Sequence, residues 1–297
     1  MTVTRTASAP VSRVTAPLFV PALDERKLAK AMAIAQAVII DLEDATADSR
    51  KAEAQQWVAH LGPDRGQQRW VRVNSVDTGM CREDILAVAP VASVIVLPKC
   101  QGKSDIDLAV GALHAVGADS VLVPIVETAI GIEAVLEIAR AAPGRIARLA
   151  LGLGDFSKDM QVVWEPGSPL SEHARCRVAI ASRVAGLAKP IDSVIPRLDD
   201  IGMLRDDIAR GRAAGFGGKF CIHPTQLDEV IAGFRPSEEE LGLERRKVEA
   251  FVEALASGTA AVVVDGHFVD YPVAELAEAR LAAEGRATGL LAPRQSS

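Results

Sequence analysis

The sequence has few aromatic residues, no excess of positive charge and no closely spaced cysteines. Lysine and arginine together number 33, against 39 aspartates and glutamates, which gives a formal net charge of −6. The basic residues are scattered along the chain rather than clustered. Because nucleic acid requires a basic surface, this distribution excludes DNA and RNA as expected partners.

Cysteine pairs and long apolar runs are also missing. Cys81, Cys100, Cys176 and Cys221 form no Cys-x-x-Cys motif, and the chain lacks the apolar stretch of a signal peptide. Reduced thiols in a cytoplasmic protein are therefore the simplest interpretation. No apolar run approaches the roughly 18 residues of a membrane span, so we expect no membrane partner.

The composition that is present describes a globular protein of one large domain or two ordinary ones. The chain has 297 residues, of which 49% are hydrophobic and 24% charged. Its first segment, "MTVTRTASAPVSRVT", consists mainly of small and polar residues. We therefore expect residues 1–15 to form a flexible N-terminus.

Short β-branched runs recur along the chain and alternate with alanine- and leucine-rich segments of helical periodicity, such as "AIGIEAVLEIARAA". Eight strands alternating with helices predict an α/β protein, a (β/α)8 TIM barrel over residues 16–233. An open doubly wound sheet is the alternative, but "FVPALDE" lacks the glycine-rich turn expected after its first strand. The predicted strands cover residues 16–22, 37–43, 69–75, 93–99, 121–128, 148–155, 190–194 and 218–224.

The segment after the barrel has a different pattern. "PSEEELGLERRKVEAFVEAL" predicts an amphipathic helix with an acidic first turn, and "AAVVVDGHFVD" predicts a strand with a turn at Asp265-Gly266. "PVAELAEARLAAEG" predicts a last helix. We expect residues 234–297 to form a C-terminal extension that packs on the barrel or on a neighbouring subunit, since it is small for an independent domain.

Polar residues follow or interrupt almost every predicted strand. In a TIM barrel the chemistry lies at the carboxyl ends of the strands, so we expect these side chains to share one rim. A single acidic residue after a strand is as often a helix cap or turn former. The expected rim residues are Asp41, Glu43, Asp44, Arg72, Asn74, Lys99, Glu127, Asp155, Asp192, Lys219 and His223.

Two of these carboxylates are the strongest candidates for a metal site. Glu127 and Asp155 end the apolar runs "VPIVE" and "ALGLGD", where an uncompensated charge would be costly. With no histidine or cysteine beside them, they favour a hard divalent ion, Mg²⁺ or Mn²⁺. Arg72, inside "WVRVN", would also need a partner, and an ion pair with a carboxylate of the second strand is expected.

Nine sequence blocks together resemble the citrate lyase beta subunit-like family, the CoA-thioester lyase branch of the HpcH/HpaI aldolase superfamily. They cover residues 17 to about 280 in the family's order, which is more specific than any one block. The blocks are "PLFVPA", "VIIDLEDA", "WVRVNS", "VIVLPK", "VPIVETAIGI", "LALGLGDFSKD", "ASRVAGLAKPIDSV", "GFGGKFCIHPTQ" and "VVVDGHFVDYPV".

The resemblance implies a Mg²⁺-binding TIM barrel, a homotrimer or higher homo-oligomer. It implies cleavage of a 3-hydroxyacyl-CoA, of the citramalyl-, malyl- or citryl-CoA type, into an acyl-CoA and a 2-oxo acid. By motif position, Glu127 and Asp155 would bind the metal and Arg72 the substrate's carboxylate and oxyanion. Asp270 would be the acid that protonates the enolate, carried on a neighbouring subunit's tail.

The resemblance also suggests roles for the other rim residues. Asp41, Glu43 and Asp44 would orient Arg72 and metal-bound water, and one of them or that water would be the general base. By position only, Lys27, Lys30 and Lys99 are candidates to bind the CoA pyrophosphate, and His223 to contact the substrate. Lys27 and Lys30 are equally plausible as solvated helix residues.

Two departures from the family pattern keep alternatives open. Thr15-Ala16 stand where the family commonly has Arg-Ser, and "SKDMQVVWEPGSP" replaces the usual continuation of "GDF". A metal-dependent 2-oxo acid aldolase that does not use CoA, or a malyl-CoA thioesterase, is therefore the alternative to the lyase. A non-catalytic subunit is disfavoured because it would not need two buried carboxylates.

Overall fold

The structure is a computed structural model that describes residues 10–62 and 68–291. The chain divides into two compact units, Met1–Phe234 and Arg235–Ser297. Each unit has its own hydrophobic core and is described separately below.

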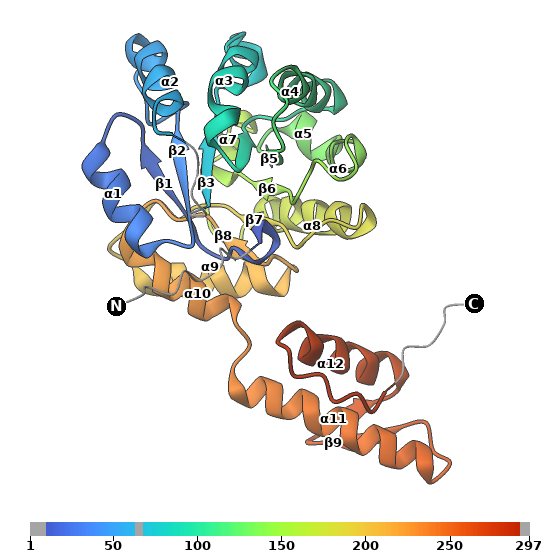
Figure 1. Cartoon of the computed structure of the whole chain (residues 1–297). Coiled ribbons are helices and arrows are strands. Elements are labelled where there is room, and N and C mark those ends of the chain that lie inside the picture. The colour runs from blue at the N-terminus through green and yellow to red at the C-terminus, as the bar shows by residue number, and fades with distance from the viewer. Residues whose placement is uncertain (1–9, 63–67, 292–297) are drawn as a thin grey trace, which may run out of the picture. The chain divides into compact units, whose positions relative to one another are not determined.

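The first unit is a parallel barrel whose strands neighbour one another in chain order (Figure 1). The barrel closes where Leu18 pairs with Cys221. There the N–H of Phe19 donates to the carbonyl of Cys221 at 2.8 Å, and the N–H of Cys221 donates to that of Pro17 at 2.9 Å. The predicted TIM barrel is confirmed. Its eight strands are β1 (Pro17–Pro21), β2 (Ala37–Asp41), β3 (Arg69–Arg72), β4 (Val94–Leu97), β5 (Val121–Val126), β6 (Ala150–Leu151), β7 (Ile191–Asp192) and β8 (Gly218–Lys219).

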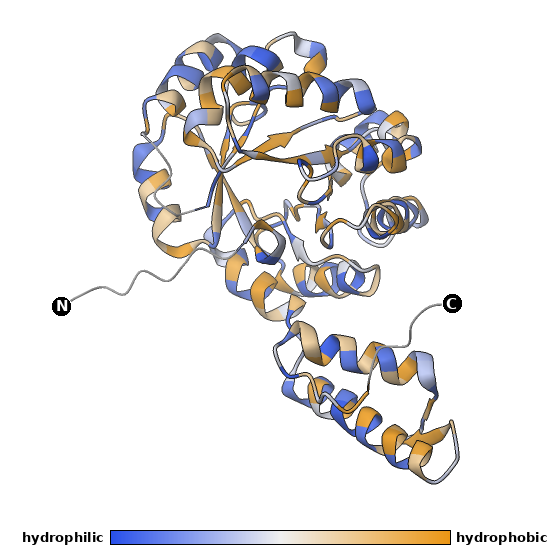
Figure 2. Cartoon of the chain, turned by 45° about the vertical axis from the view of Figure 1, so that its right-hand side comes forward, coloured by the Kyte–Doolittle hydropathy of each residue, from blue (hydrophilic) through white to orange (hydrophobic). Residues whose placement is uncertain are grey.

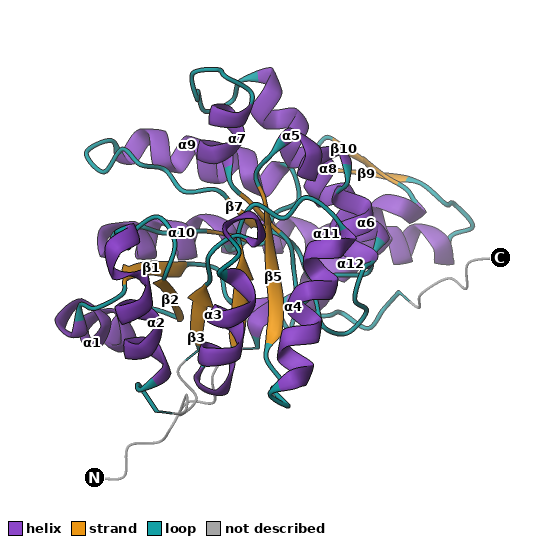
Figure 3. Ribbon diagram, turned by 90° about the horizontal axis from the view of Figure 1, so that it is seen from above, coloured by secondary structure: helices purple, strands orange, loops and turns teal. Residues whose placement is uncertain are grey.

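Helices follow the strands and surround the barrel (Figure 3). Several begin with a side-chain cap, as when Asp24 accepts from the N–H of Lys27 at 2.8 Å. The α-helices of this unit are α1 (Glu25–Ile34), α2 (Lys51–Ala59), α3 (Cys81–Val88), α4 (Lys103–Ala115), α5 (Ala129–Glu133), α6 (Val135–Arg140), α7 (Leu153–Asp159), α8 (Pro169–Val184), α9 (Ile201–Ala213) and α10 (Leu227–Phe234). Short 3-10 helices are η1 (Val11–Arg13), η2 (Asp48–Arg50), η3 (Val76–Thr78), η4 (Ala89–Val91) and η5 (Pro224–Gln226).

Figure 2 shows mainly hydrophobic strands within a ring of helices that carry both hydrophobic and hydrophilic residues. Alternation along the strands builds two apolar layers. Ile39 and Trp70 belong to the cluster inside the barrel, whereas Val38 and Val71, one position along, belong to the layer between strands and helices. Because the period is two, the residues that continue the inward positions of a strand reach the barrel mouth at its carboxyl end.

The last three strands are shorter than predicted. The segment expected as a strand over 148–155 pairs only at Ala150–Leu151, and Asp155 lies in the first turn of α7. The chain leaves the sheet at Gly152 because the next N–H, that of Leu153, donates to Ser193 Oγ at 2.8 Å. Asp155 is therefore placed by a helix and not by a strand end.

The segment over residues 1–15, which the sequence predicts to be flexible, is described from Pro10 onward. Residues 1–9 lie outside the described residues. Val14, however, is fully buried, and its carbonyl accepts from Arg148 Nη1 at 2.5 Å. The Nε of Arg148 donates to the carbonyl of Lys189 at 2.8 Å. Arg148 therefore connects the N-terminal segment to the chain just before β7. Burial without a carboxylate partner lowers the pKa of Arg148 to about 10.

Asp192 and Lys219 were expected at the barrel rim, and this is wrong. Both side chains are fully buried in a network with Arg175 of α8 and Asp207 of α9. Lys219 Nζ lies 3.1 Å from Asp192 Oδ2, and Arg175 Nη2 lies 2.6 Å from Asp207 Oδ1. They occupy outward positions of β7 and β8, so they face the helix layer.

The second unit packs α11 (Glu238–Ala256) against α12 (Tyr271–Ala283), with a hairpin of β9 (Val262–Val264) and β10 (His267–Val269). The hairpin turns at the predicted Asp265-Gly266, whose φ values of 48° and 81° suit this sequence. Ser237 begins α11 with a capping box to Glu240. Within residues 10–62 and 68–291, no helix combines the length and apolar composition needed to cross a bilayer.

Candidate active site

A cavity of about 540 Å³ opens at the carboxyl ends of the barrel strands. Asp41, Asp44, Arg72, Glu127 and Asp155 form its charged side. The rest of the lining is largely apolar, and includes Pro21, Ile125, Val194, Phe220 and Ile222. The cavity can therefore hold a small molecule that carries both charged and apolar groups.

Arg72 and Asp41 face each other from neighbouring strands. Arg72 Nε and Nη2 donate to the two oxygens of Asp41 at 2.8 and 2.6 Å. Asp41 also accepts from the N–H groups of Glu43 and Ala45, at 2.9 and 3.0 Å, in the turn that follows β2. Four donors therefore fix Asp41, which in turn fixes the plane of the Arg72 guanidinium.

Three further groups hold the same guanidinium. Its Nη1 lies 3.0 Å from Glu43 Oε2 and 3.2 Å from Asp44 Oδ2, and its carbon lies 4.9 Å from the centre of the Phe19 ring. Burial alone would lower the pKa of Arg72, but the charges of Asp41, Glu43 and Asp44 outweigh it and raise the pKa. Arg72 is thus a permanent, rigidly held cation at the cavity.

Glu127 and Asp155 come together as the sequence predicts, although from different kinds of element. Glu127 follows β5 and is only 3% exposed. Its Oε1 accepts from the main-chain N–H of Lys99 at 2.8 Å. Burial, and then the charges of Asp155 and Glu43, raise the pKa of Glu127 to about 8. The negative charge of Glu127 is therefore only weakly compensated by its surroundings.

Glu127 and Asp155 fit a hard divalent cation, for which they would supply part of the coordination shell. A Cβ atom added at Gly152 would lie 2.1 Å from Glu127 Oε2. Only glycine at this position therefore leaves enough space for the Glu127 carboxylate. Within the part of the chain that the structure describes, no three His, Cys, Asp or Glu side chains are placed to hold a metal by themselves. Mg²⁺ commonly takes one or two carboxylates and completes its shell with water and substrate oxygens.

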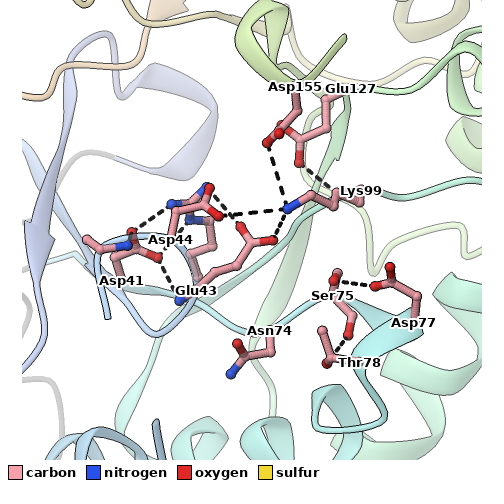
Figure 4. A network of polar contacts seen from close by, with 12 residues as sticks. Asp41, Glu43, Asp44, Asn74, Ser75, Asp77, Thr78, Lys99, Glu127 and Asp155 are labelled. Carbon is pink, nitrogen blue, oxygen red and sulfur yellow. Dashed lines mark hydrogen bonds and ion pairs between the residues drawn. The ribbon is translucent and has the colours of Figure 1, made fainter. Parts of the chain in front are cut away.

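Lys99 lies inside the carboxylate cluster (Figure 4). Its ammonium pairs with Glu43 and lies 3.7 Å from Asp155 Oδ2 and 3.9 Å from Asp44 Oδ1. Burial raises the pKa of Glu43 despite the neighbouring cations. Because the ammonium is engaged by these carboxylates, the geometry does not support the predicted contact between Lys99 and the CoA pyrophosphate.

The other predicted residues lie outside the cavity lining. Lys27 is exposed on α1 and pairs with Asp24 at 3.3 Å. His223 is exposed and caps η5 by accepting from the N–H of Thr225 at 3.3 Å. Asp270 belongs to the second unit, where it caps α12 by accepting from the N–H of Val273 at 3.3 Å. Their assigned roles stay predictions.

Thr15 and Ala16, which replace the Arg-Ser of the resembled family, lie at the amino end of β1. The carbonyl of Thr15 accepts from the N–H of Lys219 at 2.8 Å, and its N–H donates to Gln36 at 2.8 Å. The cavity lies at the carboxyl ends of the strands. This departure therefore does not remove a group from the cavity.

Two contributors to the site were missed from the sequence. Ser193 lines the cavity and accepts from the first N–H of α7, the helix that carries Asp155. Gly152 gives Glu127 its space. Both stand in short polar or glycine segments after strands, "IDSV" and "LGLGD", but only their contacts distinguish them from ordinary turn residues.

Comparison with known proteins gives a consistent family. The HpcH/HpaI aldolase/citrate lyase family matches residues 16–224. A (3S)-malyl-CoA thioesterase of Cereibacter sphaeroides is 34% identical over 258 residues, covering 85% of this chain and 88% of the relative. A citrate lyase subunit beta-like protein of Deinococcus radiodurans is 30% identical, covering 92% of this chain and 97% of the relative.

A solved structure of CitE from Mycobacterium tuberculosis, in complex with magnesium, acetoacetate and coenzyme A, is similar with a TM-score of 0.77. It is 28% identical, and the match covers 91% of this chain and 98% of CitE. Citramalyl-CoA lyase of Rattus norvegicus is also 28% identical, over 88% of this chain and 83% of the relative.

Proposed function

The chain belongs to the HpcH/HpaI aldolase/citrate lyase family, and from this membership and the site geometry we propose that it is a Mg²⁺-dependent carbon–carbon lyase. The proposed reaction cleaves a 3-hydroxyacyl-CoA of the citramalyl-, malyl- or citryl-CoA type into an acyl-CoA and a 2-oxo acid. The observation that carries the proposal is the convergence of Glu127, Asp155 and the Asp41-fixed Arg72 on one cavity.

Glu127 and Asp155 would hold the metal, with Mg²⁺ as the proposed ion and Mn²⁺ as a substitute of similar ligand preference. When bound, Mg²⁺ supplies a hard Lewis acid for the hydroxyl and carboxylate oxygens of the substrate. Magnesium in the CitE complex supports this choice.

Arg72 would bind the substrate carboxylate and the developing carbonyl oxygen. Asp41 occupies Nε and one N–H of Nη2, and Glu43 and Asp44 lie 3.0 and 3.2 Å from Nη1, which leaves the second N–H of Nη2 for the substrate. Because Asp41 is itself held by two main-chain N–H groups, the fork is preorganised before substrate arrives.

The proposed reaction is a retro-aldol cleavage of the bond between C2 and C3 of the acyl group. A base takes the proton of the 3-hydroxyl group, and the oxygen's electrons form the carbonyl of the 2-oxo acid. The C–C bond breaks, its electron pair becomes the enolate of the acyl-CoA thioester, and an acid then protonates the enolate carbon. Asp44 suits the base, because it lines the cavity and has fewer fixed donors than Asp41. Asp270 is the proposed acid.

A malyl-CoA thioesterase is the second candidate, and the 34% identity to such an enzyme favours it. It would hydrolyse the thioester and leave the hydroxy acid intact. The CoA-free aldolase loses its main support, because Thr15-Ala16 lie at the amino end of β1.

The test is a substrate panel at fixed Mg²⁺. Citramalyl-CoA, malyl-CoA and citryl-CoA are compared with their CoA-free acids, and release of 2-oxo acid is followed with phenylhydrazine. We expect cleavage of at least one thioester and of none of the free acids. Cleavage of a free acid alone would replace the lyase by the aldolase.

A further inference from the structure

Lys99 links the two halves of the site in an unusual way. It follows β4 in the left-handed region, with φ of 48°, although it is not glycine. Such a conformation is costly for most side chains and persists where the surroundings determine it. Here its N–H donates to Glu127 Oε1 at 2.8 Å, while its side chain turns back into the cluster.

The ammonium of Lys99 balances charge where the metal would otherwise do so. Among the described residues, Asp155 forms its ion pair with Lys99, and the distance from Lys99 Nζ to Asp155 Oδ2 is 3.7 Å. The guanidinium of Arg72 is held in two contacts by Asp41, and Figure 4 shows Asp41 apart from the Asp155 end of the cluster. A cation on a flexible four-carbon stem can move away when a stronger one arrives.

We propose that Lys99 is a positioning residue whose ammonium acts as a tethered counter-ion, offsetting part of the negative charge of Asp155 and Glu43 in the metal-free protein and competing with the divalent cation for Asp155. The charge of Lys99 thereby weakens metal binding, because a metal ion must displace the ammonium from Asp155 in order to bind. The inference rests on the metal site of the proposed function.

The test measures metal binding, not turnover. Mn²⁺ binding to the substrate-free protein is followed by electron paramagnetic resonance, and Mg²⁺ binding by calorimetry, in wild type, Lys99→Met and Lys99→Gln. Both neutral variants are expected to bind either ion at least about tenfold more tightly, because a positive charge within a few ångströms has been removed. Lys99→Arg keeps the charge and is expected within about threefold of wild type.

Lys103→Met is the matched control, because it removes the same charge four residues away, where Lys103 is half exposed and pairs with Asp107. Its metal affinity is expected to equal that of wild type. Circular dichroism establishes that each variant is folded.

Unchanged or weaker metal binding in folded Lys99→Gln would overturn the proposal and leave the metal site standing. Failure of both neutral variants to fold would also overturn it, because Lys99 would then be a residue needed for folding. Absence of metal binding in the wild type would instead overturn the proposed function together with this inference.

Discussion

At the scale of single residues, the geometry of Arg72 is more informative than its charge. Two parallel N–H donors engage Asp41, and a lysine at this position would keep the charge but lose the fork. We expect Arg72→Lys to lower kcat/KM at least about 100-fold, measured by steady-state release of 2-oxo acid. Arg82→Lys, at an exposed pair with Glu83, is the control. Wild-type rates in Arg72→Lys would contradict a role in substrate binding.

Glu127 gives a prediction about pH. Its folded-state pKa, near 8, lies above the ordinary value of 4.5, so between these pH values the folded protein alone keeps this proton, and the group's contribution to stability is lost progressively as pH rises from about 4.5 to about 8. Glu127→Gln removes this loss while keeping an acceptor for the N–H of Lys99. In EDTA, we expect the variant to melt above wild type by about 3 °C or more at pH 8.5 and by much less at pH 5.5.

Metal dependence separates this effect from a general stabilisation. Mg²⁺ should raise the melting temperature of wild type and leave that of Glu127→Gln unchanged. Glu133→Gln, at an exposed position on α5, is the matched control for the change of charge. A Glu127→Gln protein that Mg²⁺ still stabilises as much as wild type would contradict the assignment of Glu127 as a ligand.

The sequence alone could place some of these residues and not others. Asp41 and Arg72 continue the inward positions of their strands, as Ile39 and Trp70 show, so alternation alone predicts that they meet. The same alternation assigns Lys219 to the layer between strands and helices. The sequence does not reveal this, because β8 has only two residues and no clear alternating pattern. The side chain of Lys99 turns back into the cluster because Lys99 itself has a left-handed backbone conformation, which no local sequence pattern indicates.

At the scale of elements, the turn from β6 into α7 positions both proposed metal ligands. Gly152 leaves room for Glu127, and the following helix carries Asp155. We expect Gly152→Ala to weaken Mg²⁺ binding at least about tenfold and to cost about 1 to 3 kcal/mol of stability, because the new Cβ displaces Glu127. Calorimetry and thermal melting measure the two effects.

Gly154→Ala is the matched control, since an added Cβ there meets no atom within 4 Å. It should leave Mg²⁺ binding unchanged and favour the helix slightly. Equal metal affinity in Gly152→Ala and wild type would show that this turn does not position Glu127.

The element order could be predicted because apolar runs and helical periods repeat, but the lengths of the last strands could not. β6, β7 and β8 each have two paired residues, because caps and side-chain contacts, such as that between Ser193 and Leu153, draw the chain out of the sheet. Those contacts join residues far apart in sequence. A strand-by-strand pattern therefore overestimates the paired region.

At the scale of the whole molecule, the change in pattern after the last barrel helix predicts the division of the chain, which lies between Phe234 and Arg235. The sequence places the proposed acid, Asp270, in the second unit. If a neighbouring subunit supplies it, an inactive Asp270→Asn chain and an inactive Glu127→Gln chain should complement each other. In mixed oligomers we expect about one quarter of wild-type activity, since half of the barrels and half of the tails are intact.

Complementation needs a control for simple recovery of damaged protein. Mixing Glu127→Gln with Asp155→Asn should restore nothing, because both changes lie in the same barrel site. Activity equal to zero in the Asp270 and Glu127 mixture, in oligomers shown to contain both chains, would contradict an acid supplied between subunits.

The most direct test of the central claim is the product balance for one thioester substrate with Mg²⁺. Citramalyl-CoA is incubated with the wild-type protein, and acyl-CoA, free CoA thiol and 2-oxo acid are quantified by chromatography, with EDTA and Glu127→Gln as parallel reactions. The lyase predicts equal amounts of acyl-CoA and 2-oxo acid, no free thiol, and loss of both products in the two parallel reactions. Free thiol with an intact hydroxy acid would contradict it and establish thioester hydrolysis instead.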